Sequence, residues 1–115
     1  MPEINVLSGA AVEPGLLAAA DIFRKRTGDR VNIAFATTPE MRRLVAADAA
    51  PDVFIAPPSA LDEFARLGKV DAAARVTLGR VGVGVVVRDG APLPDVSTTA
   101  ALKRAVLDAD AVIYN

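Results

Sequence analysis

The chain contains no cysteine, histidine or tryptophan, and aromatic residues make up only 4% of its 115 residues. It therefore has no thiol nucleophile, disulfide or imidazole general base, and it lacks the ligands of most structural zinc sites. Its serines have no histidine to activate them, and its carboxylates lack the spacing of an acid–base pair or a metal cage. These absences predict that the chain is not an enzyme and needs no metal or cofactor.

An excess of basic residues is also missing. Thirteen Lys and Arg residues face fourteen Asp and Glu residues, for a net charge of −1. Proteins that bind nucleic acid usually need a basic surface, often with aromatic platforms, so we expect no nucleic-acid partner. The apolar runs are too short to cross a bilayer. Hydrophobic residues at 52% and interspersed charged residues at 23% predict a single soluble globular domain over residues 1–115.

The N-terminus carries no visible secretory signal. Met1-Pro2-Glu3 leads directly into an apolar stretch that is too short for a signal core. This indicates either that the protein stays inside the cell or that the numbering begins after a removed leader.

Strand and helix patterns alternate along the chain. Apolar residues recur at helical spacing after the first short strand, and Gly28 stands where a helix-ending glycine is expected. The run V-G-V-G-V-V-V has the strongest strand pattern. Alternation with short connections predicts an α/β fold with a mostly parallel sheet and helices on both faces. We expect strands at 4–7, 31–35, 52–56, 81–87 and 111–114, and helices at about 12–27, 37–47, 59–68 and 98–107.

In a parallel sheet, ligands bind beyond the carboxyl ends of the strands, where helices begin. The turn after the first strand, S-G-A-A, has small side chains, and the first N–H groups of the next helix have no partner within it. Such donors, together with the helix dipole, form an anion site without a basic residue. Two other interpretations are that small residues only permit tight packing, and that the Glu13 carboxylate satisfies these donors.

The turn after the second strand adds the hydroxyls of Thr37 and Thr38. Either Thr37 forms a capping box with Glu40 and leaves Thr38 for a ligand, or Thr38 itself is the cap. Because both turns belong to the same sheet edge, we expect them to converge on one anion. Three further polar residues have structural interpretations: Asp52 tethers neighbouring loops, and Ser59 and Ser97 each cap a helix.

The order and spacing of five segments resemble one protein family over nearly the whole chain. The segments are I-N-V-L-S-G-A-A-V, F-A-T-T, P-D-V-F-I-A-P, G-K-V-D and the valine-rich strand. Together they are similar to the molybdate-binding branch of bacterial periplasmic solute-binding proteins. The resemblance implies a type 2 periplasmic-binding-protein fold with two α/β lobes and a ligand cleft. It also implies a periplasmic protein that passes its ligand to the membrane permease of an ABC transporter.

The resemblance also implies which residues hold the ligand. Molybdate binders use a serine in the first turn and a hydroxyl in the second, helped by backbone N–H groups. Ala11 stands at the serine position and can give only its N–H, whereas Thr38 keeps a hydroxyl. This departure brings the chain nearer to a side branch with S-G-A in the first turn. The predicted ligand-binding residues are Ser8, Ala10, Ala11, Thr37 and Thr38.

Proteins of this family continue into a second lobe that completes the site, so residues 1–115 correspond to the first lobe. A single lobe predicts weak affinity for the small anion and self-association through its exposed cleft face and open sheet edge. Two alternatives remain open. One is a cytoplasmic ligand-sensing or regulatory module with the same fold. The other is an α/β enzyme fragment whose catalytic groups lie in other sequence.

Overall fold

The computed structural model describes residues 2–114 and divides into two compact units, Met1–Gly79 and Arg80–Asn115. The first unit contains a three-stranded sheet of β1 (Glu3–Ser8), β2 (Arg30–Phe35) and β3 (Val53–Ile55). The strand order is β2-β1-β3, and both neighbouring pairs are parallel. The prediction that residues 1–115 form a single lobe concerns both units together. This division does not test it, and it stays a prediction.

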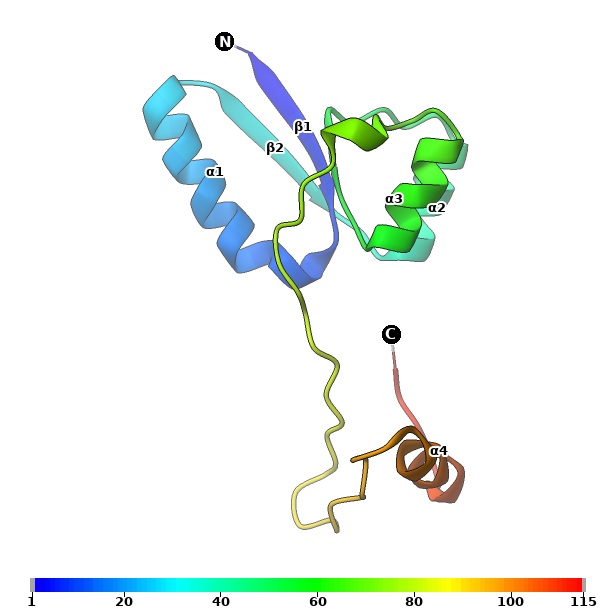
Figure 1. Cartoon of the computed structure of the whole chain (residues 1–115). Helices are drawn as coiled ribbons and strands as arrows, with labels where there is room; N and C mark the ends of the chain where they lie inside the picture. The colour runs from blue at the N-terminus through cyan, green and yellow to red at the C-terminus, as the bar shows by residue number, and fades with distance from the viewer. Residues whose placement is uncertain (1, 115) are drawn as a thin grey trace. The chain divides into compact units, whose positions relative to one another are not determined.

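Three α-helices cover the two faces of this sheet (Figure 1). A short 3-10 turn, η1 (Ala10–Val12), leads into α1 (Glu13–Thr27), which connects β1 to β2. The chain then returns through α2 (Thr38–Ala46) to β3 and continues into α3 (Pro58–Arg66). The crossover from β1 to β2 and the crossover from β2 back to β3 run in opposite directions along the sheet. For this reason α1 lies on one face, and α2 and α3 lie on the other. The predicted α/β fold, with a parallel sheet and helices on both faces, is confirmed.

Local sequence signals set the ends of two helices as expected. Gly28 ends α1 in the left-handed conformation, with a φ of 80°, and its N–H donates to the Arg24 carbonyl over 2.8 Å. Thr37 is the N-cap of α2, because its hydroxyl oxygen accepts from the Glu40 N–H over 3.4 Å. This decides between the two capping alternatives in favour of Thr37.

Two predicted caps are wrong. Ser59 lies inside α3, which begins one residue earlier at Pro58, a residue whose fixed φ suits a first helical position. Ser97 donates to Asp95, and Thr98 instead caps α4 (Thr99–Asp108) by accepting from the Ala101 N–H over 3.0 Å. In both cases the expected serine is not the residue immediately before the helix, which is the position from which a cap must act.

The core of the first unit lies between the sheet and the helices α2 and α3. Its buried side chains come from β1, from α2 and from α3, and the Phe54 ring packs against the Phe64 ring with centroids 5.2 Å apart. The cluster holds these two helices against one face of the strands and so fixes where each begins. Its buried members are Leu7, Met41, Val45, Ala60 and Phe64.

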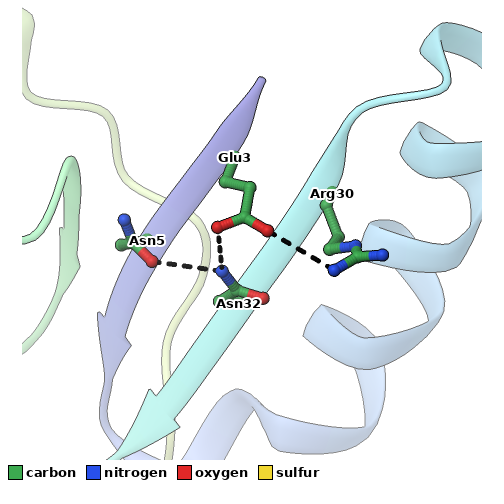
Figure 2. Close-up of polar contacts among 4 residues, drawn as sticks. All are labelled: Glu3, Asn5, Arg30 and Asn32. Carbon is green, nitrogen blue, oxygen red and sulfur yellow. Dashed lines mark hydrogen bonds and ion pairs between the residues drawn. The ribbon is translucent and has the colours of Figure 1, made fainter. Parts of the chain in front are cut away.

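The opposite end of the same sheet face carries a polar ladder across β1 and β2 (Figure 2). Glu3 is in register with Arg30, and Asn5 is in register with Asn32. The Asn32 amide donates to Glu3 over 3.4 Å and to Asn5 over 3.3 Å, and Glu3 pairs with Arg30 at 3.5 Å. Because these groups are exposed, they favour the register more than they add stability.

Asp52 ties the start of β3 to the middle of β1. Its carboxylate accepts from the Asn5 N–H over 2.8 Å, and its own N–H donates to the Asn5 carbonyl over 2.9 Å. Asp52 is therefore a tether as expected, but it joins the start of β3 to strand β1 rather than two neighbouring loops.

The second unit contains α4 and a turn at Gly90, where φ is 80°. The predicted strands at 81–87 and 111–114 are wrong: neither segment is a strand in this structure. Val83 is 100% exposed and Ile113 is 97% exposed. Their β-favouring residues are not enough, because a strand exists only where a neighbouring backbone satisfies its N–H and C=O groups. Within residues 2–114 no helix is both long and apolar enough to cross a membrane.

Candidate functional site

The three strands end side by side, and their turns are joined by backbone hydrogen bonds. Ser8, the last residue of β1, is in register with Phe35 of β2 and with Ile55 of β3. The Ala36 N–H donates to the Ser8 carbonyl over 2.9 Å, and the Gly9 N–H donates to the Ile55 carbonyl over 2.9 Å. The turns after β1 and β2 therefore lie next to each other, and the turn after β3 lies beside the first.

These bonds decide which amides remain for a ligand. The amides of Gly9 and Ala36 are used within the protein. Of the predicted residues, Ala10, Ala11, Thr37 and Thr38 have N–H groups that make no hydrogen bond within residues 2–114. The first three residues are exposed and Thr38 is half-buried. Four backbone donors from two adjacent turns are thus left at one edge of the sheet.

Ser8 does not fit its expected role as a ligand-contacting residue. It is 0% exposed, and its hydroxyl donates to the Gly9 carbonyl over 2.9 Å. Its side chain therefore has no route to a ligand at the surface of this unit.

The two threonines of the second turn have different roles. The Thr37 hydroxyl caps α2, whereas the Thr38 hydroxyl makes no hydrogen bond in the part of the chain that the structure describes. In this turn, the Thr38 hydroxyl is therefore the side-chain donor that is available, in addition to the backbone donors.

Ser59 is a candidate that the sequence analysis assigned to capping. The turn after β3 contains Pro57 and Pro58, which have no N–H, so Ser59 offers the first amide of α3. Its side chain is exposed and, among the described residues, has no hydrogen-bond partner. The signal in the sequence was the pair of prolines. Pro58 suits the first helical position, so the helix begins one residue earlier than expected and Ser59 is no longer its N-cap.

The helix starts contribute partial positive charge to this edge without a basic side chain. The positive ends of the α1, α2 and α3 dipoles belong to the residues that follow the three strands. Glu13 and Glu40 stand in the first turns of α1 and α2 and oppose this field. Hydrogen bonding from Arg43 lowers the pKa of Glu40 and offsets its charge.

Metal binding has no residue cluster to support it in the part of the chain that the structure describes. No group of three or more acidic side chains there could hold a metal ion. The arrangement is instead suited to an anion held by N–H and O–H donors.

Small ligands bind beyond the carboxyl ends of the strands in open α/β sheets, and this is the edge where the described residues leave donors without partners. Residues 4–114 match the family described as "Bacterial extracellular solute-binding protein". The match covers nearly the whole chain, and the protein belongs to this family.

A curated relative adds a correction. The chain is 32% identical over 117 residues to a protein from Pseudomonas sp named aconitate isomerase. The match covers 97% of this chain and 45% of the relative, so the chain spans less than half of that protein's length. The relative is an enzyme by name, and the expectation of a chain without enzymatic function is wrong. The absence of His and Cys excludes only the chemistry of those two side chains, and it says nothing of groups elsewhere in a longer protein.

Proposed function

We propose that this chain is a ligand-binding lobe that holds a small anion where β1 and β2 end. The donors are the N–H groups of Ala10, Ala11, Thr37 and Thr38, with the Thr38 hydroxyl beside them. One observation carries the proposal: the two turns are bonded together at Ala36 and Ser8, yet these four amides are left without partners among residues 2–114. An anion satisfies such donors at a helix start and is stabilised by the dipole.

A carboxylate is the ligand class that these observations favour. Ala11 lacks the hydroxyl that the molybdate pattern places in the first turn, whereas its N–H and that of Ala10 suit a two-oxygen acceptor. The name of the relative points the same way, since aconitate is a carboxylate. A molybdate-like oxyanion shares the chemistry of N–H recognition, and it is the alternative that a titration must separate.

Two roles share this binding step. As a solute-binding protein of an ABC transporter, the lobe would work in the periplasm and hand its ligand to a membrane permease. The family description supports solute binding outside the cell. As part of an isomerase, the lobe would anchor one carboxylate of the substrate, and the similarity to aconitate isomerase supports this second candidate.

Amide NMR on the labelled chain tests binding directly. Citrate, cis-aconitate, trans-aconitate, molybdate and sulfate would each be titrated at millimolar concentration. We expect the carboxylates to shift the amide signals of Ala10, Ala11, Thr37 and Thr38, and we expect Thr38→Ala to weaken binding. Ser97→Ala is the matched control, because Ser97 donates to Asp95 and lies in the second unit.

Three results would contradict the proposal: no shift with any anion, shifts centred on other residues, or full affinity in Thr38→Ala. Stronger shifts with molybdate than with any carboxylate would overturn the ligand class alone. Incubating the protein with cis-aconitate and following the appearance of the trans isomer by proton NMR separates the two roles.

A further inference from the structure

The buried hydroxyl of Ser8 makes one hydrogen bond among the described residues, and its partner lies in the first turn. Ser8 is 0% exposed, and its hydroxyl donates to the carbonyl of the next residue, Gly9, over 2.9 Å. A buried hydroxyl needs a partner, and this carbonyl provides it. The bond therefore fixes the direction of the Gly9 carbonyl.

The direction of that carbonyl also sets the direction of an amide in the site. The Gly9 carbonyl and the Ala10 N–H belong to the same peptide unit, which is trans. In a trans peptide the C=O and the N–H point to opposite sides. Because the Gly9 carbonyl is held by a buried group, the Ala10 N–H is directed away from Ser8. Ala10 is exposed, and its N–H has no partner within residues 2–114.

The preceding peptide unit has no such freedom. Its carbonyl, on Ser8, accepts from Ala36, and its N–H, on Gly9, donates to Ile55. The sheet itself thus fixes the Ser8–Gly9 peptide, whereas the Gly9–Ala10 peptide lies outside the sheet, at the start of η1, where the Ser8 hydroxyl bonds to its carbonyl. This hydrogen bond matters more because residue 9 is a glycine, whose backbone dihedral angles are less restricted than those of any other residue.

We propose that Ser8 is a positioning residue, which orients the Gly9–Ala10 peptide so that the Ala10 N–H faces the bound anion. The inference rests on the proposed function. It replaces the expected direct contact between the Ser8 hydroxyl and the ligand with an indirect one, through a single peptide plane.

Amide NMR of the chain without ligand tests the orientation. In Ser8→Ala we expect the Gly9 carbonyl carbon and the Ala10 amide signals to move, while the signals of Thr37 and Thr38 stay in place. Ser8→Cys keeps nearly the same volume with a weaker donor, and it should give a smaller change in the same direction. A purely structural role would instead lower the thermal midpoint and shift both turns together.

A double-mutant cycle tests the link to binding, with cis-aconitate as the probe. Ala10→Pro removes the N–H at a position where proline is compatible with a helix start. We expect Ser8→Ala to weaken binding about tenfold in the wild-type background, as loss of one charge-assisted hydrogen bond would. In the Ala10→Pro background it should change affinity little, because the amide that it orients is already gone.

Equal losses in the two backgrounds would overturn the inference, and so would an unchanged Ala10 signal in Ser8→Ala. If the wild-type chain binds no carboxylate or other anion, the proposed function and the inference both fail. A shifted Ala10 signal would then show that Ser8 orients the peptide for the turn alone. Failure of the inference by itself appears differently, as normal wild-type binding with no coupling between Ser8 and Ala10.

Discussion

The hydroxyls of Ser8, Thr37 and Thr38 all stand near the strand ends, and each has different surroundings. The Ser8 hydroxyl is buried against the Gly9 carbonyl, and the Thr37 hydroxyl caps α2. The Thr38 hydroxyl has no hydrogen bond among the described residues. Their chemistry is the same, so their roles follow from position: inside the turn, immediately before the helix, and in its first residue.

The neighbouring threonines give a test that separates stability from binding. Thr37→Ala removes the N-cap of α2 and should lower the free energy of unfolding by about 1 kcal/mol. Thr38→Ala removes no protein contact among the described residues and should cost less than about 0.5 kcal/mol. Urea unfolding followed by circular dichroism measures both. Equal costs for the two variants would contradict the assignment of Thr37 as the cap.

Phe64 is the largest buried side chain of the core, with 0% exposure. Phe64→Ala should lower the free energy of unfolding by about 3–5 kcal/mol, because it leaves a cavity beside Phe54 and removes the ring contact. Leu67→Ala is the matched control, since Leu67 follows α3 and is 60% exposed. Its expected cost is within about 0.5 kcal/mol. A cost for Phe64→Ala as small as that of the control would show that the core is not packed as described.

At the scale of the elements, α2 shows how a short helix is held in place. Thr37 caps its start, Met41 and Val45 enter the core, and Arg43 pairs with Glu40 on the exposed side. Arg42 reaches Glu63 of α3 over 2.8 Å. Burial of Met41 and Val45 accounts for most of the stability of α2, since exposed ion pairs contribute little.

The Glu40–Arg43 pair predicts a pH effect of known sign. Hydrogen bonding from Arg43 lowers the pKa of Glu40 from its ordinary value of 4.5. A carboxyl whose pKa is lowered by folding stabilises the fold above the unfolded-state pKa and loses that contribution as pH falls through the folded value. Arg43→Gln should therefore raise the Glu40 pKa toward 4.5 and remove this part of the acid dependence.

Carbon-13 NMR titration of the Glu40 carboxyl measures this change. The control is Asp95, whose pKa is lowered by hydrogen bonds from Ser97 and should not respond to Arg43→Gln. A wild-type Glu40 that titrates at its ordinary value would show that the pair does not persist in solution.

At the scale of the whole molecule, the valine-rich segment 81–87 is prominent. Its residues favour β structure, yet Val83 is 100% exposed and Val86 is 92% exposed, and the described residues offer it no strand partner. An apolar segment with unsatisfied backbone groups is a template for pairing with another chain.

We therefore expect this chain to self-associate as its concentration rises. Val83→Lys should reduce the association, because it places a charge in the segment. Ala109→Lys is the control: it adds the same charge at an exposed position of the second unit without removing a large apolar side chain. Sedimentation velocity at increasing concentration measures the effect. Equal behaviour of the two variants would show that net charge, rather than the segment, controls association.

The first three strands, the helices between them and most of their ends can be predicted from the amino-acid sequence. These features follow from local chemistry: helical spacing of apolar residues, a glycine that accepts positive φ at position 28, and a threonine that can cap at position 37. Strand alternation with short connections was enough to predict the parallel sheet and the edge where a site belongs.

Which groups remain for a ligand, and which segments are strands, depends instead on how distant parts of the chain meet in three dimensions. The Gly9 and Ala36 amides are used between turns that come together on folding, and burial assigns Ser8 to the turn itself. Segment 81–87 shows the same limit, because strand propensity is local whereas strand pairing needs a partner from elsewhere. Local preferences can be read along the chain, but hydrogen-bond partners depend on which distant segments meet.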